Sequence, residues 1–147
     1  FIVVCDSLED PHNLGAILRS AEAAGVHGVI IPKRNSVTLN YTVAKTSAGA
    51  IEYVPVVKVA NLPAAIDELK SRGVWIFGAD MDGTDYTALD YSGSIALVIG
   101  SEGKGIGRLV REKCDFIASL PMRGKINSLN ASVAAGILMF EAAKHRN

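Results

Sequence analysis

The sequence predicts an α/β fold in which a mostly parallel sheet carries helices on both faces. Short runs of β-branched residues alternate with helical patterns along the whole chain, which is typical of a parallel sheet. The runs are continuously apolar rather than alternating, as expected for strands that are covered on both faces. The expected strands are 1–4, 28–32, 53–59, 74–79, 95–100 and 116–121, and the expected helices are 13–24, 40–48, 62–72, 106–112 and 129–145.

The helices can be justified from caps and apolar periodicity. The first begins at Asn13, a capping residue, and ends before Gly25, while the helix at 62–72 ends before Gly73. In the last helix, positions 131–140 are almost all apolar or small, so we expect it to be buried all round or to pack against a partner subunit. The two earlier helices each carry one apolar stripe, formed by Leu14, Ile17, Leu18 and Ala21 and by Leu62, Ala65, Ile66 and Leu69.

The totals indicate one domain with a sizeable core. The chain has 147 residues, of which 49% are hydrophobic and 20% charged, and its net charge of zero argues against holding nucleic acid by bulk electrostatics alone. It has no apolar run near the roughly 18 residues that span a bilayer and no signal-peptide pattern, so we expect a soluble, cytoplasmic protein without a membrane partner. Because Phe1 already lies in a strand pattern, we expect the natural protein to continue upstream.

Several residues that could carry chemistry are better explained structurally. Cys5 and Cys114 lie far apart in apolar runs and are expected to be reduced, buried thiols. The three histidines, His12, His27 and His145, lack ligand spacing, so no metal site is expected. The acidic stretch 80–94 is predicted to be a surface loop.

Three segments follow strands, at the sheet edge where such folds bind ligands. "DPHNLGAILRSAEAAG" offers Asn13 and Arg19, which by themselves are a helix cap and a surface arginine. "LVIGSEGKGIGRL" offers Glu102 in a loop whose glycines allow close backbone approach, but its spacing fits neither the dinucleotide fingerprint nor a P-loop. The third, "SLPMRGKINSLNASVAAGILMFEAAKHR", offers Ser128 and Asn130, which as local sequence are caps of the last helix.

Together the three segments resemble a known family. "NLGAILRS", "LVIGSEGKGI" and "LPMRGKINSLNASVAAGILMFEA" are similar, in order and spacing, to the three motifs of the SpoU/TrmH group of SPOUT RNA ribose 2′-O-methyltransferases. The sequence of residues 10–40 looks closest to the bacterial 23S rRNA guanosine 2′-O-methyltransferases. The resemblance implies a C-terminal trefoil knot, S-adenosylmethionine bound in that knot, an RNA substrate, and a homodimer with its sites near the subunit interface. It covers essentially the whole chain, so residues 1–147 are expected to be the catalytic domain, without the N-terminal RNA-binding domain that related rRNA-modifying enzymes usually carry.

The resemblance also implies the site residues. Five polar side chains match the family's motif positions: Asn13, Arg19, Glu102, Ser128 and Asn130. Gly100, Leu120 and Leu129 match positions whose backbone cradles the cofactor. Arginine is a poor base because its pKa exceeds about 12, so we expect Arg19 to bind a phosphate or stabilise the developing alkoxide, and proton acceptance stays open between water, a phosphate and a perturbed Arg19. Asn13 would orient the ribose or Arg19, Glu102 would hold the loop and helix in place, and Ser128 and Asn130 would contact cofactor or ribose.

Three other interpretations stay open from the sequence. A tRNA ribose could be the target in place of rRNA. A nucleotide- or dinucleotide-binding enzyme could use "IGSEGKGIG" as a phosphate loop, although the failed motif spacings count against it. A non-catalytic RNA-binding or scaffold dimer of the same fold is the third, and the intact motif residues count against that one.

Overall fold

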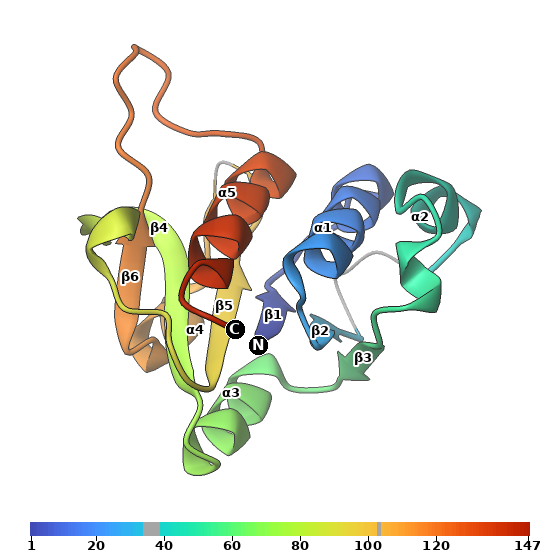
Figure 1. Cartoon of the computed structure of the whole chain (residues 1–147), viewed down its shortest axis with the longest axis horizontal. Coiled ribbons are helices and arrows are strands. Elements are labelled where there is room, and N and C mark those ends of the chain that lie inside the picture. Colours follow the sequence, from blue (N-terminus) through green and yellow to red (C-terminus); the bar gives the residue numbers. More distant parts are fainter. Residues whose placement is uncertain (34–38, 103) are drawn as a thin grey trace.

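The computed structural model describes residues 1–33, 39–102 and 104–147, and within them the chain forms a six-stranded sheet. The strand order is β3-β2-β1-β5-β4-β6, and the neighbouring strands of this sheet pair in parallel. Figure 1 shows the helices arranged around this sheet. The strands are β1 (Ile2–Cys5), β2 (Gly28–Pro32), β3 (Val56–Val59), β4 (Trp75–Asp85), β5 (Ile95–Ile99) and β6 (Phe116–Ser119). The helices are α1 (Pro11–Ala24), α2 (Tyr41–Thr46), α3 (Leu62–Ser71), α4 (Arg108–Lys113) and α5 (Ala131–Ala143), with 3₁₀ turns at Ala50–Glu52 and Tyr86–Ala88.

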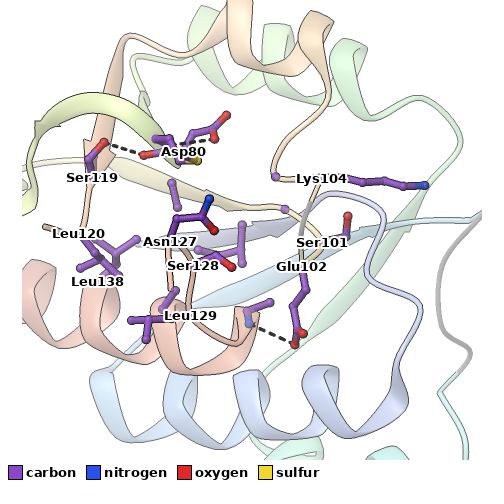
Figure 2. A pocket seen from close by; sticks show the side chains of 18 of the residues that line it. Asp80, Ser101, Glu102, Lys104, Ser119, Leu120, Asn127, Ser128, Leu129 and Leu138 are labelled. Atoms are coloured by element: carbon purple, nitrogen blue, oxygen red, sulfur yellow. Dashed lines mark hydrogen bonds between the residues drawn. The ribbon is translucent and has the colours of Figure 1, made fainter. Parts of the chain in front are cut away.

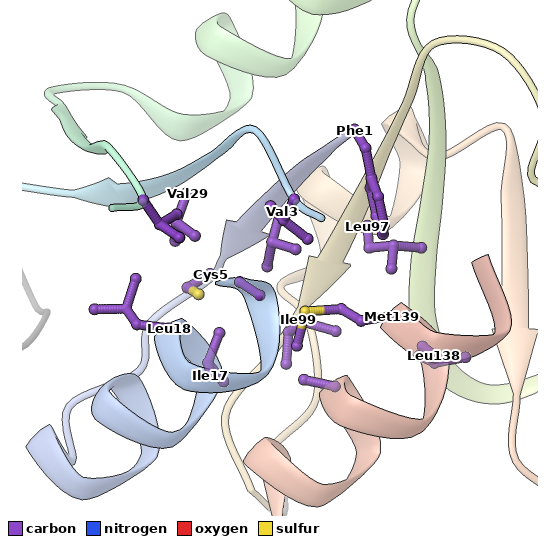
Figure 3. Packing of buried hydrophobic residues seen from close by; sticks show 14 of the residues in the cluster. Phe1, Val3, Cys5, Ile17, Leu18, Val29, Leu97, Ile99, Leu138 and Met139 are labelled. Carbon is purple, nitrogen blue, oxygen red and sulfur yellow. The ribbon is translucent and has the colours of Figure 1, made fainter. Parts of the chain in front are cut away.

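The sheet is covered on both sides by separate apolar clusters. Side chains of α1 and α5 pack on one face with Val3 and Leu97, as Figure 3 shows, while α3 and α4 pack on the other face with Val4 and Val98. Successive strand residues point to opposite faces, so every residue of the central strand β5 is buried. The predicted fold class is therefore confirmed, whereas the trefoil knot stays a prediction.

The stretch 80–94, which the sequence suggested was a surface loop, is more ordered than that. β4 runs on to Asp85, and its register against β6 shifts between Ala79 and Thr84. Ser119 explains the bulge, because its hydroxyl donates to the carbonyl of Asp80 at 2.6 Å and accepts the Gly83 N–H at 2.7 Å. These two bonds satisfy backbone groups that the interrupted ladder leaves without partners.

The first helix begins earlier than its sequence pattern indicated. Pro11 is the first helical residue, and the carboxylate of Asp10 caps the helix by accepting the His12 N–H at 2.9 Å. Asn13 is therefore inside the first turn rather than at the cap, and its side chain is buried. This shift leaves the Asn13 amide available for a distant partner.

Of the two alternatives for α5, burial all round does not hold within this chain, since Val133 and Phe140 are each about half exposed, at 51% and 49%, and packing against a partner subunit stays a prediction. One further expectation needs correction. Cys114 follows α4 instead of lying in a strand, and it is partly exposed, whereas Cys5 is fully buried as expected.

The connection between β6 and α5 is exposed. In Figure 1 this segment projects from the body of the molecule before the chain returns to begin α5. Residues 121–130 are all exposed, including Ile126 at 77%. Ser128 and Leu129 thus belong to an exposed connection that returns to the body of the molecule just before α5 begins.

Candidate active site

A cavity of about 450 Å³ opens where the sheet's central strands end, next to the start of α5. Its size falls within the range of small-molecule and cofactor sites, about 300–1,000 Å³. Figure 2 shows side chains from the middle of β4, from the ends of β5 and β6 and from the segment before α5 around this space. Five of the residues singled out in the sequence line it: Gly100, Glu102, Leu120, Ser128 and Leu129.

The loop after β5 folds back on itself, and glycine makes this possible. A Cβ on Gly100 would lie 2.1 Å from the backbone carbonyl carbon of Gly105, which no side chain could tolerate. Gly105 has a φ of 67°, and its N–H donates to the carbonyl of Ser101 at 2.9 Å. The close backbone approach expected from the glycine pattern is confirmed at these two positions.

Glu102 joins the three sequence segments. Its Oε1 accepts the side-chain N–H of Asn13 at 3.2 Å, the side-chain N–H of Asn130 at 2.6 Å and the backbone N–H of Ala131 at 3.4 Å. Asn130 in turn caps α5, because its Oδ1 accepts the backbone N–H groups of Ser132 and Val133. One carboxylate oxygen thus holds α1, the glycine loop and the N-terminus of α5 together.

A second cavity of about 550 Å³ lies beside the first. It is lined by Asn13 and the residues Ser7–Asp10, and Ser101, Glu102 and Lys104 line both cavities. Arg19 is exposed on α1 and is absent from the described linings of both cavities. Within one chain, the structure therefore brings together the predicted residues other than Arg19.

An ion pair at the cavity wall was missed by reasoning from the sequence. Asp80 lines the first cavity, and its Oδ2 forms an ion pair at 2.6 Å with Arg111 of α4, which lies behind the wall. Arg111 also donates to the carbonyl of Met81 at 3.3 Å, so α4 clamps this part of the wall. The signal for Asp80 was present, because it directly follows the strand expected at 74–79.

Asp6 is a third residue that the motifs did not reveal. It is 9% exposed, and its Oδ2 accepts the N–H of Gly107 at 2.7 Å. This bond ties the end of β1 to the start of α4 and thereby fixes the far end of the glycine loop. Beside it, burial raises the pKa of the Cys5 thiol to about 12, with the Asp6 charge a smaller cause, so Cys5 is no nucleophile at neutral pH.

Within the described ranges, no group of three or more His, Cys, Asp or Glu side chains could hold a metal ion. Among the helices that the structure describes, none is long and apolar enough to cross a membrane.

Comparison with known proteins decides the family. The model of the SpoU rRNA Methylase family matches residues 1–140, which is nearly the whole chain. The chain belongs to this family. It is 57% identical over 148 residues to the Bacillus subtilis protein YacO, named as a TrmH family tRNA/rRNA methyltransferase.

Solved structures of SpoU-family proteins share the fold. AviRb from Streptomyces viridochromogenes, a SpoU methyltransferase solved in complex with AdoMet, aligns with a TM-score of 0.91 at 30% identity over 98% of this chain and 59% of its own. The TrmH/SpoU tRNA modifying enzyme of A. aeolicus aligns with a TM-score of 0.89 at 31% identity, over 99% of this chain and 74% of its own. The match to YacO includes 100% of this chain but only 59% of the length of YacO.

Proposed function

We propose that this SpoU-family protein transfers a methyl group from S-adenosylmethionine to a ribose 2′-hydroxyl of RNA. The observation that carries the proposal is the convergence of Gly100, Leu120, Leu129, Glu102 and Ser128 on one cavity of cofactor size. These residues come from two segments separated in the sequence, so their meeting is a property of the fold. AviRb, which has the same fold, was solved with AdoMet.

The first cavity fits this cofactor by its chemistry. Asp80, Asp82 and Glu102 supply carboxylates that would favour a ligand carrying a sulfonium and an ammonium group. Leu120, Leu129 and Leu138 supply apolar surface for a purine ring. When bound, S-adenosylmethionine offers an electrophilic methyl carbon, whose bond to sulfur breaks with the electron pair leaving on sulfur as the ribose oxygen attacks.

The chain's own residues have to position the ribose oxygen and allow its proton to leave. Oε1 of Glu102 already accepts three N–H groups, so we assign Glu102 to holding the site in shape rather than to proton removal. An arginine stays protonated, so Arg19 is assigned to a phosphate or to the developing alkoxide. The proton then passes to water or to an RNA phosphate. Ser128 and Asn130 are assigned to contacts with cofactor or ribose, and Asn13 to orienting the ribose.

We further propose that the protein acts as a homodimer. On α5, Val133 and Phe140 are about half exposed, and Ile137 between them is only partly covered, which makes an apolar stripe suited to a second copy. Arg19 lies on α1, which packs against α5, so a second copy docked along this stripe would meet the helix pair that carries Arg19. In the proposed dimer, Arg19 acts at the cavities of the partner subunit, because it is absent from the described linings of both cavities of its own chain.

Subunit mixing tests this arrangement. Arg19→Ala and Glu102→Ala subunits, each inactive alone, should regain about a quarter of the wild-type activity when mixed, if Arg19 serves the partner's site. No recovery on mixing, together with a monomer in sedimentation, would contradict the dimer.

For the target, we propose a guanosine of 23S rRNA, on the similarity of residues 10–40 to that group, and a cytoplasmic location where this RNA is made and modified. Methyl transfer from tritiated S-adenosylmethionine to ribosomal and to transfer RNA, followed by mapping of the 2′-O-methyl position, tests the proposal. If tritium were incorporated into transfer RNA alone, the target would be a transfer RNA and not 23S rRNA. Tight RNA binding without any transferred label would favour the scaffold interpretation.

A further inference from the structure

The two cavities share a wall, and Lys104 is the basic side chain that the described residues place in it. Ser101, Glu102 and Lys104 line both spaces, so a ligand in one cavity lies next to a ligand in the other. Transfer of a group between two bound molecules requires such adjacency, because the reacting atoms have to come within about 3–3.5 Å of each other.

The charges around this wall are uneven. Among the described residues that line either cavity, Lys104 is the only cation, whereas Glu9, Asp10 and Glu102 line the second cavity. Lys104 is exposed and takes part in none of the ion pairs found among the described residues. Figure 2 shows its side chain extended away from Leu120 and Leu138, the apolar part of the first cavity.

We propose that the second cavity is the acceptor subsite and that Lys104 binds a phosphate of the RNA nucleotide being methylated. The inference rests on the proposed function, since it assumes that the first cavity holds the methyl donor. A phosphate entering beside three carboxylates meets like charge, which an unpaired ammonium directly offsets. Asn13 lines the same cavity and offers amide groups suited to a ribose hydroxyl.

The test separates a phosphate contact from a cofactor contact. In the natural full-length protein, Lys104→Ala should weaken RNA binding about tenfold, the loss expected for one charge-assisted hydrogen bond. It should also lower the slope of log affinity against log salt by about one. Lys104→Arg, which keeps the charge, should restore both, and the Kd for S-adenosylmethionine in calorimetry should stay unchanged.

Lys58→Ala is the matched control, because Lys58 is exposed on the edge strand β3 and lines neither cavity. The proposal is overturned if Lys104→Ala leaves RNA binding unchanged, if it weakens cofactor binding instead, or if Lys58→Ala has an equal effect. RNA affinity is read by filter retention, which needs no turnover. Absence of methyl transfer by the wild type would therefore refute the proposed function separately.

Discussion

Replacing Glu102 with alanine tests the central contact of the site. The substitution removes an acceptor shared by two asparagine side chains and one backbone N–H. If Glu102 mainly holds three segments together, the variant should lose stability and not only activity. A residue that acts solely on the substrate would leave the free energy of unfolding unchanged.

The size of the effect follows from what each donor loses. Asn13 is only 8% exposed, so its N–H group is left without a partner, at a cost of about 1–3 kcal/mol. Asn130 is exposed and the Ala131 bond is long at 3.4 Å, so water replaces these two at a cost of about 0.5 kcal/mol each. The expected loss is about 2–4 kcal/mol, which for a chain of this size lowers Tm by roughly 6–12 °C.

Urea and thermal unfolding followed by circular dichroism measure this loss. Glu112→Ala is the control, since Glu112 forms an exposed pair with Arg108 at 3.6 Å on the surface of α4, worth at most about 0.5 kcal/mol. Glu102→Gln retains an acceptor oxygen and should fall between the two variants. If Glu102→Ala unfolded at the same urea concentration as Glu112→Ala, the assignment of Glu102 to holding the site together would be refuted.

Three further outcomes are expected. Gly100→Ala places a Cβ 2.1 Å from the facing backbone and should destabilise by more than about 3 kcal/mol in urea unfolding, whereas Gly124→Ala, with open space around it, should change stability by less than about 0.5 kcal/mol. Arg111→Ala removes the ion pair with Asp80 at the cavity wall and should weaken S-adenosylmethionine binding about tenfold in calorimetry. Lys113→Ala is the control, because Lys113 pairs with Asp67 of α3 away from the cavity, and it should leave the affinity unchanged. Equal affinities of the two variants would show that the Arg111 ion pair is dispensable. The pKa of Cys5 is raised from 9.0 to about 12, so the folded state holds its proton longer than the unfolded chain, and stability should fall as pH rises from about 9 toward 12; the Cys5→Ala variant should show a flatter profile over this range.

The sheet was predictable because its strands have a clear local sequence pattern. Continuous apolar runs such as 95–99 are buried on both faces, and this is what a central parallel strand requires. The extension of β4 beyond Ala79 was not predictable, because it depends on Ser119, 36 residues from Gly83, supplying bonds to a bulge. Residues 80–85 are mostly polar and contain a glycine, so local sequence alone indicated a loop.

The site was predictable to the extent that it consists of strand ends and motif residues. The pairing of Asn13 with Glu102, 89 positions apart, could be anticipated only through family resemblance, since as local sequence both residues look like caps. Asp10 in fact provides the cap, and that single shift converts Asn13 from a structural residue into one that lines a cavity. The role of Arg111 had no local signal at all, because it depends on α4 packing beside the bulge in β4.

The arrangement around Glu102 also explains why polar residues begin a helix that is otherwise apolar. Asn130 caps α5 with its oxygen and donates from its nitrogen at the same time, which an aspartate could not do because an ionised carboxylate has no proton to donate. The buried apolar face of α5 packs on α1 and the sheet, and this packing fixes the position of Asn130 relative to the cavity. Core packing and site geometry are therefore set by the same helix, and a substitution that shifts α5 displaces Asn130 from Glu102 and so alters the cavity without touching any ligand.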